Sequence, residues 1–249
     1  MFTFLLKRFY QAVIVMFVIS LVAFSIQDNL GDPLRELVGQ SVSESVRQEL
    51  RDKMGLNDPF LVKYSRFLQN AVQGDLGTSY FFKRPALEVI LDKLVATLEL
   101  VFAAALIIVV VSIPLGVYSA IRPRSFLTKL IMAVSSIGIS IPVFLTAIML
   151  MYLFSIQLGW LPAYGRGETY NLLGWESGFF TWDGIKHLIL PAVSLSSIML
   201  PLFIRLVRSE MLEQLSSEYV KFARAKGLDN NKVYYQHALK NTMLPVITV

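Results

Sequence analysis

The sequence predicts an all-α, polytopic membrane protein, and three observations lead to this fold class. Of the 249 residues, 55% are hydrophobic and only 16% are charged, whereas soluble domains carry roughly 25% charged residues. The mean hydropathy is +0.57. Four long runs contain no charged residue at all, and apolar runs of about 20 residues are typical of membrane-spanning helices.

The four uncharged runs give the positions of the spans. They cover residues 9–26, 100–121, 130–161 and 188–204. The third run is longer than the ~20 residues that one crossing needs, so we expect it to leave the membrane near residue 156. We therefore expect spans at about residues 9–27, 98–121, 130–156 and 187–207, with a fifth starting at residue 245.

The first run has an alternative interpretation as a cleaved signal peptide. The apolar core of such a peptide is about 7–15 residues long and ends at a cleavage site of small residues. This run is eighteen residues long, and the bulky side chains of Phe24 and Ile26 lie where small ones are needed. The sequence therefore favours a span.

The basic residues of the short loops predict the orientation. Lys7 and Arg8 precede the first span, three more basic residues lie between the second and third, and Arg205 and Arg208 follow the fourth. All of them lie on one side if the N-terminus is cytoplasmic. The net charge of +5 then reflects basic cytoplasmic loops rather than a nucleic-acid partner. There is no cysteine, and the two histidines are fifty residues apart, so we expect no metal site.

Residues 28–93 form an outer segment that we expect to be helical. Val42, Val46, Leu50 and Met54 recur every four residues before Gly55, which predicts an amphipathic helix and its end. A second helix is expected with Asn57 or Asp58 as its cap, Pro59 in its first turn and one apolar stripe. The residues of that stripe are Phe60, Tyr64, Phe67, Leu68 and Val72.

The segment between the fourth and fifth spans, residues 208–244, is charged but patterned like a helical hairpin. Tyr219, Phe222, Ala223 and Lys226 follow helical spacing. Gly227 predicts the helix end, because glycine readily takes the left-handed conformation found there. Asp229 can cap a second helix over residues 230–240. Such a hairpin suits either docking into a groove of a partner protein or lying on anionic lipid.

Residues 208–245, RSEMLEQLSSEYVKFARAKGLDNNKVYYQHALKNTMLP, resemble the cytoplasmic coupling loop of ABC importer permeases. The resemblance is to the B-type subunit of the dipeptide and oligopeptide branch. It extends over the chain through GDP at 31–33, GLNDPF at 55–60, GDLGTS at 74–79, ATLEL at 96–100 and LPAVSL at 190–195. The general importer motif has Glu-Ala-Ala where this chain has Lys221, Phe222 and Ala223. Permeases of the peptide branch are similar to this chain in this departure.

The resemblance implies a permease subunit that carries di- or oligopeptides across the bacterial inner membrane. Its implied partners are a second homologous permease, two cytoplasmic ATPases that bind ATP and magnesium, an extracytoplasmic substrate-binding protein and the lipid bilayer. The chain itself has no phosphate-binding GxxxxGK[ST] loop, so we expect neither a cofactor nor an enzymatic activity in it. Nickel complexes or glutathione are the alternative cargoes within the family.

The resemblance also implies which residues couple to the ATPases. Gly227 is the expected elbow of the hairpin, and Arg224 and Lys226 either pair with acidic residues of the ATPase or form a solvated basic face. The implied coupling set is Glu218, Tyr219, Phe222, Ala223, Arg224, Ala225, Lys226, Gly227, Leu228, His237, Leu244 and Pro245. We expect His237 to be structural. Permeases of this type usually have two further spans after the loop, so we also expect this chain, which stops at Val249, to be truncated.

Two residues within the spans are candidates for the translocation path. Glu99 is ionisable and lies at the edge of the second span, and Pro142 lies within the third, where a proline bends the helix axis. A proton-coupled secondary transporter is the rival class. It would need acidic or histidine groups in the middle of the membrane, and the four runs contain none.

Overall fold

The computed structural model describes residues 2–29, 44–53, 55–79, 81–172 and 175–248. The chain divides into two compact units, Met1–Lys93 and Leu94–Val249. The expectation of one permease domain over the whole chain stays a prediction.

The first unit is built on the packing of two helices, α1 (Phe2–Asn29) and α4 (Phe60–Val72). Phe24 contacts the rings of Phe60, Tyr64 and Phe67, with centroids 5.4–5.6 Å apart. The Tyr64 hydroxyl lies 2.8 Å from the hydroxyl of Ser20. These contacts confirm most of the predicted apolar stripe on α4, because its aromatic residues are the ones that face α1.

Two details of this unit differ from the sequence expectations, and two of the predicted residues lie outside the described part of the chain. Pro59 is the residue that precedes α4, and Asp58 pairs with Arg66 at 2.7 Å instead of capping the helix. Val72 is exposed and does not belong to the packed stripe. The other predicted helix is present as α3 (Glu44–Lys53), followed by Gly55 with φ of +62°. Val42 and Met54 lie outside the described residues.

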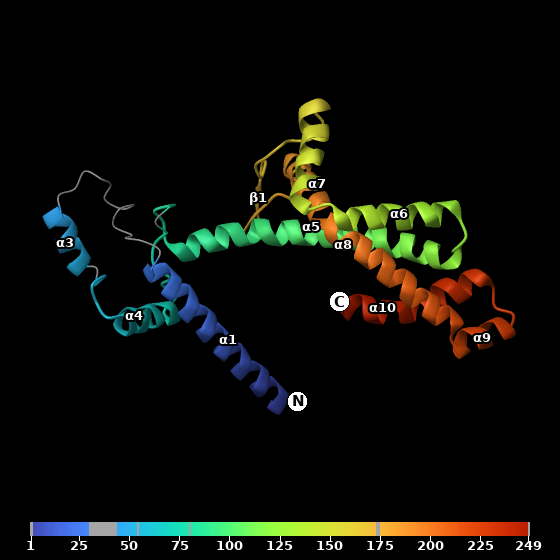
Figure 1. Ribbon diagram of the computed structural model, residues 1–249, viewed down its shortest axis with the longest axis horizontal. Helices are drawn as coiled ribbons and strands as arrows, with labels where there is room; N and C mark the ends of the chain where they lie inside the picture. The colour runs from blue at the N-terminus through green and yellow to red at the C-terminus, as the bar shows by residue number, and fades with distance from the viewer. Residues whose placement is uncertain (1, 30–43, 54, 80, 173–174, 249) are drawn as a thin grey trace. The chain divides into compact units, whose positions relative to one another are not determined.

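The second unit is a helical bundle with one short hairpin of strands (Figure 1). Its elements are α5 (Ala86–Ile121), which begins in the first unit, α6 (Phe126–Ser140), α7 (Val143–Leu150), the π-helical η1 (Met151–Gln157), β1 (Tyr170–Leu172), β2 (Trp175–Ser177), α8 (Trp182–Ser216), α9 (Glu218–Ala225), the π-helical η2 (Lys232–Ala238) and α10 (Leu239–Thr248). β1 and β2 are antiparallel, with Tyr170 opposite Ser177. The sequence did not predict this hairpin.

Within the described residues, three helices are long and apolar enough to cross a membrane. They are Phe2–Ile26, Ala86–Ile121 and Trp182–Ser216. Each extends past the uncharged run that predicted it, because charged residues outside the membrane can continue the same helix. The second expected span begins twelve residues early, at Ala86 rather than residue 98, and α8 continues to Ser216.

The third expected span is not one straight helix. The chain bends by 107° between α6 and the helix formed by α7 and η1. Together the two helices make a fourth candidate span. The break has a local cause in Pro142, which lacks a backbone N–H and disfavours helical geometry in the residue before it. Ile141 accordingly takes the extended conformation, with φ of −89° and ψ of 123°. Figure 1 shows α7 leaving the direction of α6 at this point.

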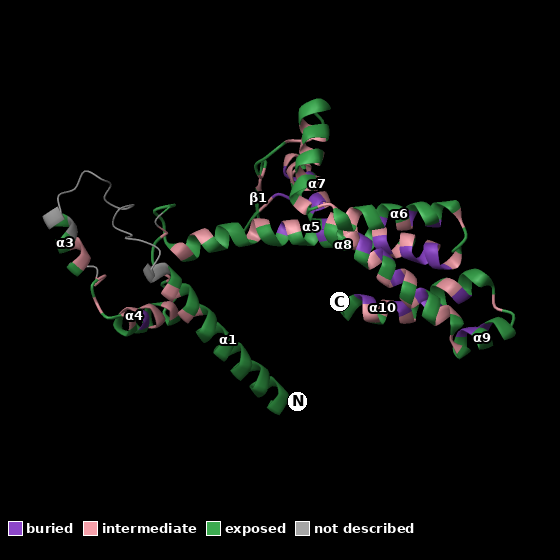
Figure 2. Cartoon of the chain, viewed as in Figure 1, coloured by how far each residue is buried: buried purple, intermediate pink, exposed green. Residues whose placement is uncertain are grey.

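The core of the second unit lies where α5, α8, α9, η2 and α10 meet (Figure 2). α5 and α8 approach closely at Gly116, where a Cβ atom would lie only 2.6 Å from the Cβ of Val207. The fully buried side chains of Val207, Met211 and Val233 fill the centre of this core. The core therefore joins two long membrane helices to the short helices of the 208–244 segment.

Candidate functional site

The 208–244 segment forms the predicted helical hairpin, and one face of it is anchored in the core. α9 ends at Ala225, and Gly227 follows with φ of +78°, a conformation that glycine adopts without steric cost. Asp229 accepts a hydrogen bond from the backbone N–H of Asn231 at 3.0 Å. The second helix does not end near Asn241 as expected, because η2 continues directly into α10 and the helix extends to Thr248.

The two faces of α9 differ sharply. Val220 is fully buried and Ala223 is only 5% exposed, and both pack in the cluster that contains Val207 and Met211 of α8. Phe222, in contrast, is 61% exposed. Helical spacing groups Ala223 with Phe222, but the structure turns Ala223 toward the chain's own core. Ala223 is therefore not available for contact with another protein.

The outward face of α9 is aromatic and basic. The Lys226 ammonium lies 4.6 Å from the centre of the Phe222 ring, a favourable cation–π distance. Lys221 pairs with Glu218 at 2.8 Å, and the Tyr219 hydroxyl donates to Gln214 at 2.8 Å. We call this surface the outer face of α9; its members are Glu218, Tyr219, Lys221, Phe222, Arg224, Ala225 and Lys226, all exposed.

The remaining residues of the coupling set lie in different surroundings. Leu228 is half-buried against the core. His237 is half-buried in η2. Leu244 is exposed on α10, and Pro245 lies inside that helix rather than opening a new one. The hairpin thus brings the residues of α9 together on one surface, while Leu228, His237 and Pro245 belong to its packed side or its continuation.

The other candidate, Glu99, lies in a buried network at the opposite end of α8 from α9. Glu99 is 6% exposed. Its carboxylate pairs with Arg166 at 3.3 Å and accepts a hydrogen bond from the backbone N–H of Gly178 at 2.9 Å. Arg166 also donates to the backbone carbonyl of Glu176. These contacts tie α5 to the loop that carries β1 and β2.

The start of α8 fixes the other side of this loop. The Thr181 hydroxyl caps α8 by accepting from the N–H of Gly184 at 3.0 Å. Asp183 accepts from the N–H of Glu168 at 2.9 Å, and the Nδ1 atom of His187 lies 2.8 Å from the Asp183 carbonyl. The loop is therefore held both by α5 and by α8.

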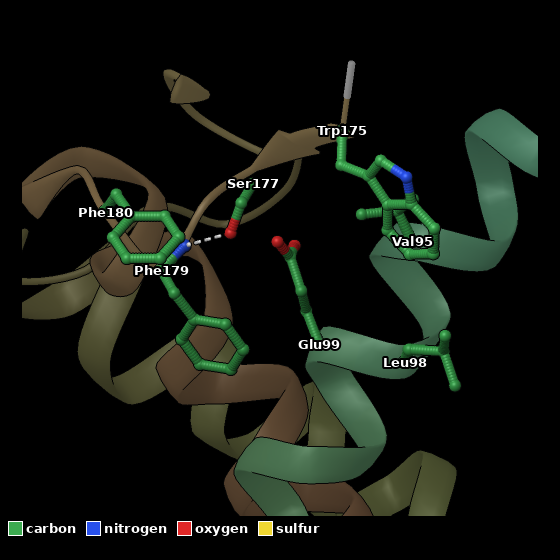
Figure 3. A pocket seen from close by; sticks show the side chains of 7 residues that line it. All are labelled: Val95, Leu98, Glu99, Trp175, Ser177, Phe179 and Phe180. Atoms are coloured by element: carbon green, nitrogen blue, oxygen red, sulfur yellow. Dashed lines mark hydrogen bonds between the residues drawn. The ribbon is translucent and has the colours of Figure 1, made fainter. Parts of the chain in front are cut away.

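A pocket of about 470 Å³ opens beside Glu99 (Figure 3). Its lining is mostly apolar and comes from α5 and the loop: Val95, Leu98, Glu99, Trp175, Ser177, Phe179 and Phe180. In Figure 3 the Glu99 side chain rises from α5 toward the strand that carries Trp175 and Ser177. The pocket thus has an aromatic wall and a single charged edge.

The sequence indicates Glu99 but not its partners. Arg166 is separated from it by 67 residues, and in the sequence it is one charge among several in an outer loop. A lone arginine between two glycines carries no signal of its own. Only the fold brings it to α5.

Comparison with known proteins extends over the whole chain. Residues 112–249 match the family described as the binding-protein-dependent transport system inner membrane component, and residues 1–101 match the corresponding N-terminal family. The dipeptide transport system permease protein DppB of Alkalihalophilus pseudofirmus is 34% identical, with 100% of this chain and 79% of the relative covered. The oligopeptide transport system permease protein AppB of Bacillus subtilis is 38% identical, over 100% and 78%.

A third relative is named for a different cargo. The glutathione transport system permease protein GsiC of Escherichia coli is 30% identical, over 100% of this chain and 76% of the relative. All three relatives are permeases, and the matched families together cover most of the 249 residues. The chain therefore belongs to the inner-membrane permease family of binding-protein-dependent ABC transporters, as a multi-pass membrane protein of the dipeptide and oligopeptide permease type.

Proposed function

We propose that this chain is a permease subunit of a di- or oligopeptide importer and that the outer face of α9 docks into a partner ATPase. One observation carries the proposal: α9 is anchored on one side and free on the other. Its inner face is part of the core formed by α5 and α8, and its outer face carries exposed Phe222. A bulky aromatic beside a cation, on a helix of fixed position, suits insertion into a groove of a second protein.

The anchoring also gives a physical route for coupling. Val220 and Ala223 pack in the same cluster as Val117 of α5 and Val207 of α8. Because packed cores resist continuous deformation, a force on α9 moves these helices together as one body. ATP binding and hydrolysis by the partner would thus change the position of α5 and α8 through contact with α9.

The translocation path would run past the two candidates at the outer half of the second unit. Irregular backbone at membrane depth is tolerated where it is buried in protein or lines a cavity, and the break at Pro142 is such a place. The pocket beside Glu99 is large enough for an amino-acid side chain. Its aromatic lining and charged edge suit a peptide, which is apolar in parts and charged at its ends.

The remaining parts of the proposal concern assembly and orientation. The partners are a second homologous permease, two ATPases and an extracytoplasmic binding protein, and the N-terminus is cytoplasmic. The positions of the basic residues support the orientation. Glutathione is the second candidate cargo, supported by the similarity to a glutathione permease; it is itself a short peptide derivative and would fit the same chemistry.

Substitution of Phe222 tests the docking surface. The assembled transporter is purified with Phe222→Ala, and retention of the ATPases and peptide uptake are measured. Tyr164→Ala is the matched control, because Tyr164 is also a highly exposed aromatic but lies in the loop at the other end of α8. We expect Phe222→Ala to reduce ATPase retention about tenfold, as for the loss of an aromatic anchor in an interface, and the control to have little effect. Equal retention in both variants would refute the docking surface.

A competition assay separates the cargoes. Uptake of a labelled dipeptide is measured with excess unlabelled oligopeptide, glutathione or a nickel complex. Competition by peptides alone supports the proposed cargo, and competition by glutathione alone moves the assignment to the second candidate.

A further inference from the structure

Two arginines of α8 reach α6 at the end of the bundle near α9, and Lys129 of α6 lies close to them. The guanidinium of Arg205 donates to the Ser136 hydroxyl at 2.7 Å, and that of Arg208 reaches the Met132 sulfur at 3.8 Å. The two helices thus run antiparallel here, since successive residues of α8 meet earlier residues of α6. Lys129 is exposed and lies one turn before Met132 on the same face of α6.

Most of the hydrogen-bonding capacity of the two arginines is unused. A guanidinium has five N–H donors. Ser136 takes one from Arg205, and a thioether is only a weak acceptor for Arg208. The Nε atom of Arg208 is buried and has no partner within the described chain. Because a buried donor without a partner costs free energy, an acceptor placed beside Arg208 would stabilise this site.

No carboxylate among the described residues pairs with Arg205, Arg208 or Lys129. Glu210 and Glu213 are close in sequence, but they lie two and five residues after Arg208. Residues at these spacings lie on different faces of a helix. Within the part of the chain that the structure describes, the three positive charges along the α6–α8 contact therefore lack a counter-charge.

The surface next to these charges is apolar and faces outward. Arg205 directly follows the uncharged run that ends at Ile204, so it lies at the boundary of the membrane. On the membrane side, Leu202 and Ile139 are exposed and continue the same faces, each three residues from Arg205 or Ser136. A ligand for this surface thus has an anionic group beside an apolar tail.

From this arrangement we propose that the α6–α8 contact binds the headgroup phosphate of an anionic phospholipid. The phosphate oxygens accept from Arg205 and Arg208, whose planar guanidinium groups suit bidentate contact with phosphate, and Lys129 adds a third positive charge. The acyl chains lie along Leu202 and Ile139. Basic pockets between membrane helices are suited to such headgroups. The proposal does not depend on the cargo or on the docking of α9.

The experiment measures the binding of fluorescent phosphatidylglycerol to the purified chain in uncharged detergent. A basic side chain that contacts the headgroup contributes about fivefold to the affinity for an anionic lipid, so we expect Arg205→Gln with Arg208→Gln to weaken binding on the order of 30-fold. The matched control is Arg224→Gln with Lys226→Gln, which removes two exposed cations from α9; it should change binding by less than about threefold. Arg205→Lys with Arg208→Lys keeps the charge but loses the planar geometry, and we expect intermediate binding.

Two further measurements distinguish a lipid site from a simple anion site and from a protein interface. Phosphatidylcholine and inorganic phosphate should compete poorly, because the first lacks net charge and the second lacks the acyl chains. Efficient competition by inorganic phosphate, or equal losses in the two double Gln variants, would overturn the lipid site. Unchanged lipid binding together with lost retention of a partner protein would show instead that the arginines meet an acidic protein surface. Thermal unfolding of each variant verifies that it is folded.

Discussion

The carboxylate of Glu99 and the guanidinium of Arg166 form an ion pair of 3.3 Å between residues 67 positions apart. The Glu99 side chain is 7% exposed and that of Arg166 is 29% exposed. The pair connects a membrane helix to the loop of β1 and β2. Loss of Arg166 leaves the more deeply buried charge, that of Glu99, without a partner. We therefore expect substitutions of Arg166 and of Glu99 to differ in how much they destabilise the protein.

Arg166→Met should destabilise the protein more than Glu99→Gln. Arg166→Met leaves the buried carboxylate without its counter-charge, and we expect the free energy of unfolding to fall by about 2–3 kcal/mol. Glu99→Gln keeps an acceptor for the N–H of Gly178 and should cost about 1 kcal/mol. Thermal unfolding in detergent measures both. A larger loss for Glu99→Gln would argue that the carboxylate matters for something other than this pair.

Because α5 and α8 approach closely at Gly116, adding a single methyl group there is expected to destabilise the protein. Gly116→Ala places a Cβ 2.6 Å from the Cβ of Val207, and such overpacking costs about 1–3 kcal/mol. Val207→Ala in the same chain makes room, so the double variant should regain part of the stability lost in Gly116→Ala. The free energies of unfolding of the two single variants and the double variant form a cycle. Additive losses would mean that the two residues do not share this contact.

Substitution of Gly227 is expected to act through the backbone conformation alone. A Cβ there meets no atom within 4 Å, but the residue has φ of +78°. Gly227→Ala should therefore cost about 1–2 kcal/mol from the backbone alone, and Gly227→Asn should cost less, since Asn tolerates this conformation better. Thermal unfolding measures the loss of stability, and ATPase retention measures separately whether the docking of α9 is affected. Equal stability of wild type and Gly227→Ala would show that the turn can relax.

The absence of cysteine from the sequence makes the orientation directly testable. Arg124→Cys and Tyr164→Cys each introduce a single thiol at an exposed position. If the N-terminus is cytoplasmic, a membrane-impermeant maleimide applied to intact spheroplasts labels position 164 and not position 124. Labelling should reach position 124 only after the membrane is permeabilised. The reverse pattern would invert the proposed topology.

The sequence predicted the helices well because their signals are local. Uncharged runs located the spans, and Gly227 and Asp229 located the turn of the hairpin and the start of its second helix. Pro142 was expected to bend the third span, but a break of 107° was not predictable, since it depends on how α6 and α7 pack against α8. Ala223 shows the limit of helical spacing: a short helix with apolar residues on two sides does not reveal which side faces the core.

The helical hairpin of residues 208–244 was predictable from the sequence, and the surroundings of Glu99 were not. The hairpin is contiguous in sequence, so a motif can represent it. The network of Glu99 depends on Arg166 and on the N–H of Gly178, and the pocket depends on aromatic residues of β2 and the loop after it. Contacts between such distant segments come from the packing of the whole unit, which one sequence does not display.

The continuous length of α8 has a mechanical consequence. Its 35 residues extend about 50 Å at 1.5 Å per residue, from the Thr181 cap beside the β hairpin to Ser216, two residues before α9. A tilt of about 5° around one end of a rod of this length displaces the other end by about 4 Å. α8 can therefore act as a lever, in which a small rotation at the inner hairpin becomes a shift of atomic size at the loop that Glu99 and Asp183 hold.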